Sequence, residues 1–130
     1  AERAKKRGAK LCIPLKVSGP WHSRFMAEAG EELRQALAGC AIGQPAIPVI
    51  SNVSAREHSN DPNLIRDNLV KQLVSPVLWT DTMRGFLKQG HSLYLEVGPG
   101  KVLAGLMRDI DRQARIVGVQ QAEDLSKLRA

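Results

Sequence analysis

The sequence VSGPWHSRFM at residues 17–26 decides how the first half of the chain folds, because it joins two predicted elements of different kinds. Residues 10–17 (KLCIPLKV) have the composition of a strand. Residues 23–38 have the apolar spacing of an amphipathic helix. Gly19 and Pro20 mark the turn between them. His22 is therefore expected directly before the start of a helix.

This position gives His22 a definite chemistry. Unpaired backbone N–H groups and the helix dipole disfavour positive charge at a helix start, which favours the neutral imidazole. A neutral imidazole accepts a proton, so His22 is a candidate general base. The alternative is that His22 is only a polar surface residue beside a turn.

The remaining predicted elements alternate between helices and strands. In chain order they are the end of a helix over 2–8, an extended segment over 45–53, a loop over 54–60, a helix from Asp61-Pro62 to about 74, a helix over 79–89, a strand over 92–97, a helix over 101–111, a strand over 115–119 and a helix over 122–130. On the strand over 92–97, Leu93, Leu95 and Val97 share one face. Strands that alternate with helices predict an α/β fold.

Composition excludes several classes of protein. The sequence has no run of about 18 apolar residues, so no membrane span is expected, and its first residues are polar and basic, unlike a signal peptide. Cys12 and Cys40 are too few for a disulfide scaffold and predict reduced, buried thiols of a cytoplasmic protein, without a metal site. The net charge of +6 suits an acidic partner, but few aromatic residues and no nucleic-acid motif argue against nucleic acid.

Other patterns have ordinary explanations. Gly98-Pro99-Gly100-Lys101 lacks the spacing of a P-loop and is interpreted as a strand-to-helix turn, although the helix start there remains able to accept an anion. We expect His58 and His91 at the surface. We expect four carboxylates to be solvated: Glu31, Glu32, Asp109 and Asp111. No G-x-S-x-G elbow is present, so the sequence contains a candidate base without a nucleophile.

Four blocks together carry a resemblance to a known family: VSGPWHSRFM (17–26), PVISNV (48–53), LVKQLVSPVLWTDTM (69–83) and LYLEVGPGKVLAGLMR (93–108). In this order they resemble the C-terminal part of malonyl-CoA:acyl carrier protein transacylases, and the bacterial fatty-acid enzyme more than a polyketide synthase domain. The resemblance implies an α/β-hydrolase-like acyltransferase domain with a ferredoxin-like subdomain. Residues 1–17 would be the last helix and strand of the small subdomain, and residues 18–130 the C-terminal part of the large one.

The resemblance also implies a mechanism. A serine attacks the malonyl thioester of coenzyme A, and the phosphopantetheine thiol of acyl carrier protein then takes the malonyl group. His22 matches the family's base, and the main-chain carbonyl of Gln72 matches the group that orients it. Trp21 either forms a wall of the acyl pocket or packs in the core. Asn52 either faces the active-site cleft or caps a loop, which we favour.

The same resemblance sets the expected partners. They are malonyl-CoA as substrate, acyl carrier protein, and a missing N-terminal lobe of the same enzyme that supplies the serine; no permanently bound cofactor is expected. The isolated chain is therefore predicted to be inactive. The alternative is a non-catalytic module that docks an acidic carrier protein.

Overall fold

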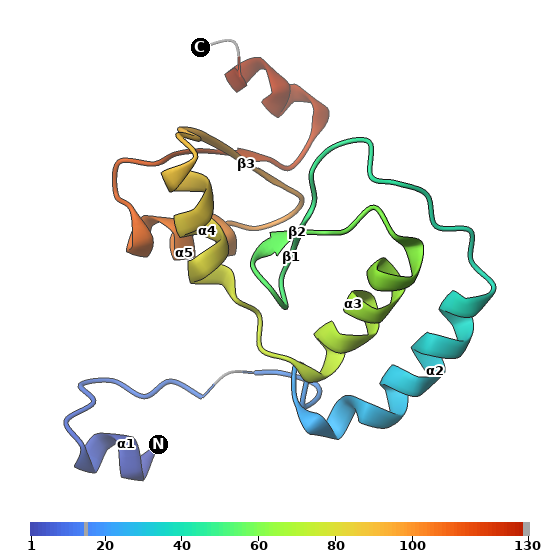
Figure 1. Cartoon of the computed structure of the whole chain (residues 1–130). Helices are drawn as coiled ribbons and strands as arrows, with labels where there is room; N and C mark the ends of the chain where they lie inside the picture. Colours follow the sequence, from blue (N-terminus) through green and yellow to red (C-terminus); the bar gives the residue numbers. More distant parts are fainter. Residues whose placement is uncertain (15, 129–130) are drawn as a thin grey trace.

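The computed structural model describes residues 1–14 and 16–128. Figure 1 shows a pair of long helices, a hairpin of very short strands, and a unit of two strands with helices beside them. The elements are α1 (Glu2–Lys6), η1 (Arg24–Met26), α2 (Ala27–Ala38), β1 (Ile50–Ser51), β2 (Arg56–Glu57), α3 (Pro62–Val74), α4 (Trp79–Lys88), β3 (Leu93–Val97), α5 (Val102–Ile110), β4 (Arg115–Val119) and η2 (Ala122–Leu128). The predicted α/β class is confirmed.

The helices α2 and α3 pack side by side (Figure 1). The start of α3 follows its sequence signal, since the Asp61 carboxylate accepts a hydrogen bond of 2.8 Å from Asn63 N–H and Pro62 occupies the first turn. Gly30 is the buried residue of α2, and a Cβ atom there would stand 3.7 Å from Val70 of α3. This is an ordinary van der Waals distance, so alanine would also fit at this point between the two helices.

A half-buried arginine joins the two helices at their other end. The Arg66 guanidinium of α3 donates to the main-chain oxygens of Leu37, at 3.0 Å, and Cys40, at 2.7 Å. These carbonyls lie at the end of α2, where helical donors run out and a cation is favourable. Arg66 therefore caps α2 from the neighbouring helix.

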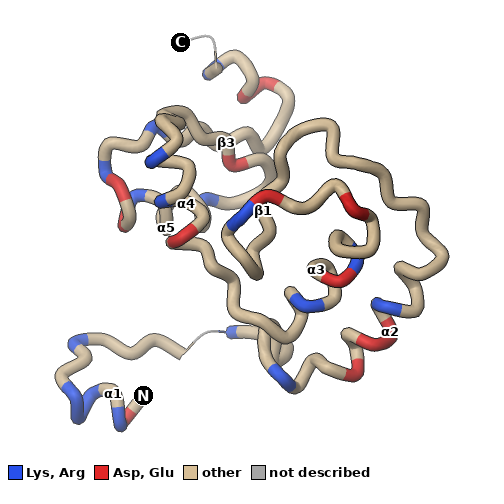
Figure 2. Tube along the Cα trace, viewed as in Figure 1, with Lys and Arg blue, Asp and Glu red and all other residues tan. Residues whose placement is uncertain are grey.

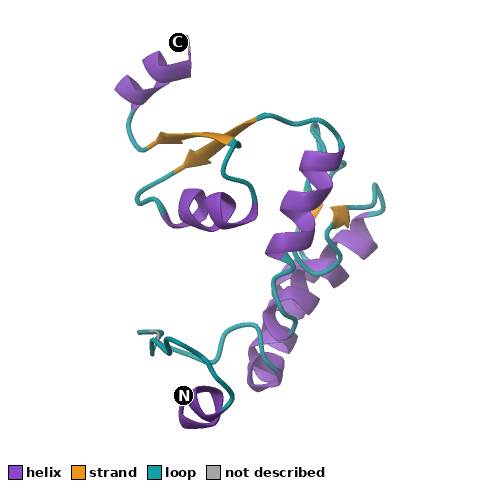
Figure 3. Cartoon of the chain, turned by 90° about the vertical axis from the view of Figure 1, so that its left-hand side faces the viewer, coloured by secondary structure: helices purple, strands orange, loops and turns teal. Residues whose placement is uncertain are grey.

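The second unit is a parallel pair of strands joined by a helix. β3 and β4 pair in register from Leu93 opposite Arg115 to Val97 opposite Val119. α5 lies along one face of the two strands (Figure 3) and contributes Met107, which is only 2% exposed. Leu93, Leu95 and Val97 share the opposite face, as the alternation predicts, and all three are exposed.

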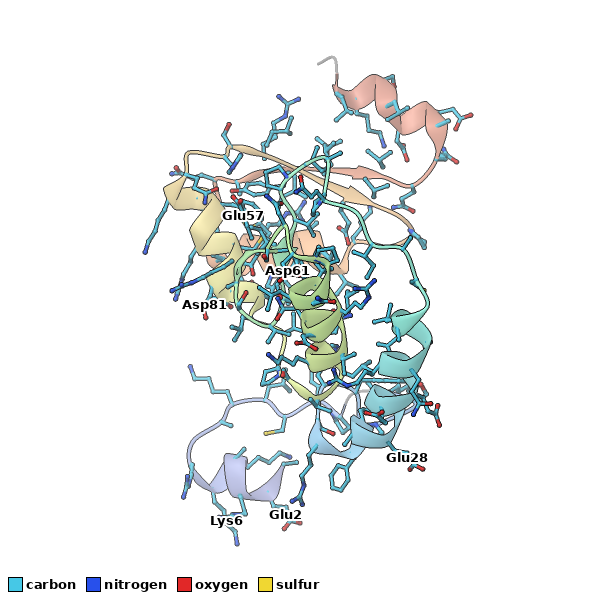
Figure 4. The ribbon with its side chains drawn as sticks, turned by 45° about the vertical axis from the view of Figure 1, so that its right-hand side comes forward. Glu2, Lys6, Glu28, Glu57, Asp61 and Asp81 are labelled. Atoms are coloured by element: carbon cyan, nitrogen blue, oxygen red, sulfur yellow. The ribbon has the colours of Figure 1, made fainter. Side chains whose placement is uncertain are left out.

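The strand predicted over 10–17 is wrong for the residues that are described. Residues 10–14 and 16–17 form no strand, and residue 15 lies outside the described residues. A strand needs a neighbour for its backbone groups, whereas Leu11, Ile13 and Val17 are more than two-thirds exposed. The segment extends as an arm that ends in α1, whose Glu2 and Lys6 lie apart from Glu57 and Asp61 (Figures 1 and 4).

Three smaller predictions need correction. The loop expected over 54–60 contains β2, which pairs antiparallel with β1. The helix expected over 122–130 is the 3-10 helix η2, and residues 129–130 lie outside the described residues. The thiols are free as expected but not buried: Cys12 is half-buried, and Cys40 is exposed because it follows the end of α2. Among the described residues, no helix is long and apolar enough to cross a membrane.

Candidate functional site

The turn before α2 holds His22 in an unusual backbone conformation. Its φ is 59°, in the left-handed region that non-glycine residues rarely occupy. Ser23 stabilises the turn on both sides: its hydroxyl donates to the Pro20 carbonyl at 2.6 Å and accepts from Phe25 N–H at 3.4 Å. Ser23 is thus the N-cap of η1, the 3-10 turn that leads into α2. His22 does lie directly before a helix start, as predicted.

The imidazole of His22 reaches across to α3. Its Nδ1 lies 2.8 Å from the main-chain oxygen of Gln72, fifty positions later in the chain. A carbonyl oxygen accepts and never donates, so this contact selects the tautomer with hydrogen on Nδ1. The lone pair of the neutral ring then lies on Nε2. Because His22 is exposed, that nitrogen is free to accept a proton from a group outside the described contacts.

The partner of this ring is a neutral dipole. Among residues 1–14 and 16–128, no carboxylate forms an ion pair with His22. The lysines and arginines gather most densely on α1 and the residues just after it (Figure 2). A carbonyl orients an imidazole without adding a charge that would stabilise the protonated ring as strongly as a carboxylate does.

Trp21 and Asn52 lie in different settings. Trp21 is 54% exposed in this chain, and its ring covers Gly19, where a Cβ atom would stand 3.3 Å from the indole. Asn52 lies in the turn between β1 and β2, and its carbonyl accepts a hydrogen bond of 2.8 Å from Leu78 N–H. The described contacts bring His22 and Gln72 together and include no hydrogen bond between Asn52 and His22.

The helix start at the Gly98–Lys101 turn is already occupied. The two oxygens of Glu96 accept hydrogen bonds of 3.0 Å from Leu103 N–H and Ala104 N–H, in the first turn of α5. Glu96 is nearly buried in β3. The segment is a strand-to-helix turn as interpreted, and the chain supplies an anion of its own at this helix start. An acidic residue inside the apolar run LYLEV was the signal that sequence reasoning missed.

A hollow elsewhere in the described residues does not have His22 on its lining. It measures about 570 Å³ and lies between α5, β4 and η2, with Lys101, Arg108 and Lys127 on its lining. Glu96 and Asp124 are the two carboxylates on its lining. Asp124, like Glu96, accepts its hydrogen bonds from other groups of the chain. The Lys127 ammonium at 2.6 Å and the Gln120 N–H at 2.8 Å hold the pKa of Asp124 below its ordinary value of 3.8. We therefore place the candidate site at His22 and not at this hollow.

The other titratable groups fit ordinary roles. Glu31, Glu32 and Asp109 are exposed as predicted, whereas Asp111 is half-buried. His91 is exposed and His58 is half-buried with its Nδ1 enclosed, so the surface prediction is right only for His91. Within the described part of the chain, no cluster of three or more histidine, cysteine or acidic residues has the geometry to hold a metal.

Comparisons with known proteins point to one family, although a scan against protein-family models finds no match. The malonyl CoA-acyl carrier protein transacylase of Bacillus subtilis is 40% identical over 125 residues, which cover 96% of this chain and 39% of that protein. The corresponding protein of Staphylococcus aureus (strain COL) is 37% identical over 124 residues, covering 95% of this chain and 40% of its own length.

Solved structures agree with the sequence relatives. The Coxiella burnetii malonyl CoA-acyl carrier protein transacylase matches with a TM-score of 0.93 and 39% identity, over 98% of this chain and 40% of that one. A malonyl-transacylase solved in complex with a type II PKS acyl-carrier protein matches with a TM-score of 0.90 and 36% identity, over 97% and 40% of the two chains. The chain spans about 40% of the length of these relatives.

Proposed function

We propose that this chain, which is similar over nearly its whole length to part of malonyl CoA-acyl carrier protein transacylases, is the C-terminal part of an enzyme that moves a malonyl group from coenzyme A to the phosphopantetheine thiol of acyl carrier protein. His22 is its general base. The observation that carries the proposal is the 2.8 Å contact from His22 Nδ1 to Gln72 O, which leaves Nε2 as the proton acceptor.

In this proposal His22 acts in both halves of the exchange. Nε2 removes the proton of a serine hydroxyl supplied by the rest of the enzyme, and the serine oxygen bonds to the malonyl carbonyl carbon. The imidazolium returns that proton to the sulfur of coenzyme A as the C–S bond breaks. The thiol of acyl carrier protein then gives its proton to Nε2, attacks the seryl ester, and the serine oxygen recovers the proton as it leaves.

The Gln72 carbonyl takes the place that a carboxylate has in many serine–histidine sites. Its task is to keep the proton on Nδ1 through both steps, so that Nε2 always faces the reacting atoms. This task needs only the main-chain oxygen. The Gln72 side chain is therefore not required by the mechanism.

Two further residues are assigned more modest roles. The exposed indole of Trp21, next to His22, is a wall of the acyl pocket that crowds a branched α-carbon and so favours malonyl over methylmalonyl. One methyl group changes binding by only about 1–3 kcal/mol, so this preference is moderate. Asn52 is assigned to the substrate side of the site, although its main-chain bond to Leu78 supports the structural alternative of a loop cap.

The division of the chain and its partners follow from the same proposal. Residues 1–17 belong to a small ferredoxin-like subdomain and residues 18–130 to a large α/β-hydrolase-like one, in a cytoplasmic enzyme without a permanently bound cofactor. Acyl carrier protein is the protein partner, since a relative has been solved in complex with one. The basic arm around α1 and the net charge of +6 suit an acidic partner (Figure 2).

The alternative is a module that docks an acidic carrier protein without chemistry, and one experiment separates the two. The N-terminal part of the Bacillus subtilis relative, up to the start of the similarity, is fused to this chain. Malonyl transfer to acyl carrier protein is then measured for the fusion and for the chain alone. We expect transfer by the fusion only. A soluble, folded fusion that binds acyl carrier protein but transfers nothing would favour the docking module.

A further inference from the structure

The acceptor of the His22 hydrogen bond lies at a special place in α3. In an α-helix each carbonyl accepts from the N–H four residues later. For Gln72 that residue is Pro76, which has no N–H. The helical donor for this one oxygen is therefore missing from the covalent structure itself, whatever conformation the chain adopts after α3.

The neighbouring carbonyls near the end of α3 differ in this respect. The residues four positions after Lys71 and Leu73 are Ser75 and Val77, which both carry an N–H. Continuing the helix by a turn would satisfy those oxygens but not that of Gln72. Proline is thus placed at the single position where it frees the oxygen that His22 contacts at 2.8 Å.

Pro76 also ends α3 soon after Gln72, which keeps the Gln72 oxygen open to His22. A residue before proline is pushed out of the helical region, and Ser75 has φ −113° and ψ 149°, which is extended backbone. The chain then turns away toward α4, and Leu78 N–H bonds to Asn52 O. Because no further helical turn follows α3, the Gln72 oxygen stays accessible to an imidazole that approaches from the turn before α2.

We propose that Pro76 is a positioning residue for His22: by withholding the N–H that a helix would direct at Gln72 O, it reserves this oxygen for His22 Nδ1–H and so fixes the tautomer of the imidazole. The purpose of that tautomer rests on the proposed function, but the bond and its dependence on Pro76 do not. The inference is therefore testable without an activity measurement.

The test is nitrogen NMR of the ¹⁵N-labelled chain, in which the two ring nitrogens of His22 report which of them carries the proton. The variants are Pro76→Ala and Pro76→Gly, with His22→Gln used to assign the signals. Both variants restore an N–H at position 76, but alanine favours helix over glycine. Competition by the new N–H therefore predicts a larger loss of the Nδ1–H tautomer in Pro76→Ala than in Pro76→Gly.

Loss of packing predicts the opposite order, since glycine removes more of the side chain than alanine. Amide hydrogen exchange at position 76 gives a second measurement, and we expect slower exchange in Pro76→Ala as the new N–H bonds to Gln72 O. Pro62→Ala, at the other end of α3, is the matched control and should leave the His22 signals unchanged.

Three results would overturn the inference. They are an unchanged His22 tautomer in Pro76→Ala, an effect in Pro76→Gly as large as or larger than in Pro76→Ala, and an equal change in Pro62→Ala. Failure of the fusion enzyme to transfer malonyl would count against the proposed function alone, because none of these readouts uses transfer.

Discussion

The turns that lead into α2 and α5 differ in how their polar groups are satisfied. Before α5, the Glu96 carboxylate accepts hydrogen bonds from two N–H groups of the first helical turn, and glycines take the left-handed backbone positions at φ 126° and 103°. Before α2, a histidine takes the left-handed position at φ 59°, and one of its ring nitrogens is used by the chain while the other is left over. The first arrangement is closed on itself, and the second is open to a reactant.

The difference teaches how to separate a structural turn from a functional one. Glycine adopts positive φ without strain, whereas a residue with a side chain does so at a cost of order 1–3 kcal/mol. Histidine at such a position, where glycine would fit the backbone better, is consistent with a use for its ring, whereas Ala55, at φ 53°, has no side-chain group that a reaction would use. At the α5 turn no residue meets that description.

The largest effect expected from this comparison is on transfer. In the fusion described above, His22→Ala removes the group that moves the proton in every step of the proposed mechanism, so kcat should fall by about 10²–10⁴-fold. The matched control is His58→Ala, which should change kcat little. Equal losses of kcat in the two variants, or an unchanged kcat in His22→Ala, would contradict the idea that the free ring nitrogen of His22 acts on a reactant.

The next effect is on stability at the closed turn. Glu96→Ala leaves the Leu103 and Ala104 N–H groups without their acceptor in a nearly buried position, so the free energy of unfolding should fall by about 3 kcal/mol. Urea unfolding of the chain measures it. The control is Glu57→Ala, an exposed residue of β2, for which we expect a change within about 0.5 kcal/mol. A small change in Glu96→Ala would mean that this turn is not closed by its carboxylate.

A smaller effect reports the backbone strain at His22. His22→Ala and His22→Gly both remove the bond to Gln72, but only alanine retains a Cβ atom at positive φ. The glycine variant should therefore be more stable than the alanine variant by about 1 kcal/mol in urea unfolding. The same pair of substitutions at His91, which is not among the residues of positive φ, should give no such advantage to glycine. Equal stabilities at position 22 would argue against strain.

The smallest effect concerns the other internally satisfied carboxylate, Asp124. Its pKa is lowered in the folded chain by Lys127 and by the Gln120 N–H, so the unfolded chain binds its proton first as pH falls. Its contribution to stability is complete above the unfolded value of 3.8 and is lost as pH decreases through the lower folded value. Wild type should thus lose more stability than Asp124→Asn over this acid range. Parallel curves for the two proteins would show that the groups at Asp124 are not coupled to folding.

The sequence predicted those elements whose signals are local. Asp61 and Pro62 predict the start of α3. The alternating apolar residues of β3 and the glycines around it predict the strand and the turn that follows it. The position of His22 before a helix start can also be predicted, because that position depends only on neighbouring residues. Features that depend on contacts between distant parts of the chain cannot be predicted in this way. Whether residues 10–17 form a strand depends on a neighbouring strand, and the 2-residue pairing of β1 with β2 is too short to leave a pattern.

The candidate site divides in the same way. The contact between His22 and Gln72 was expected only through the family resemblance, since nothing in the composition of either segment links positions fifty apart. The positive φ of His22 had no signal at all, because a histidine in that conformation looks like any other in sequence. Glu96 stands out in sequence as an acidic residue inside the apolar run LYLEV, but its partners become evident only once α5 is placed beside β3.

The pairing of α2 with α3 has a consequence for how the chain is made. Every atom of the His22–Gln72 contact belongs to residues that precede β3 in the chain, and Arg66 ties the same two helices together at their far end. Since polypeptides leave the ribosome from the N-terminal side, all the residues of this contact emerge before β3 and β4 do. The pairing of α2 with α3 therefore requires no residue of the parallel-strand unit.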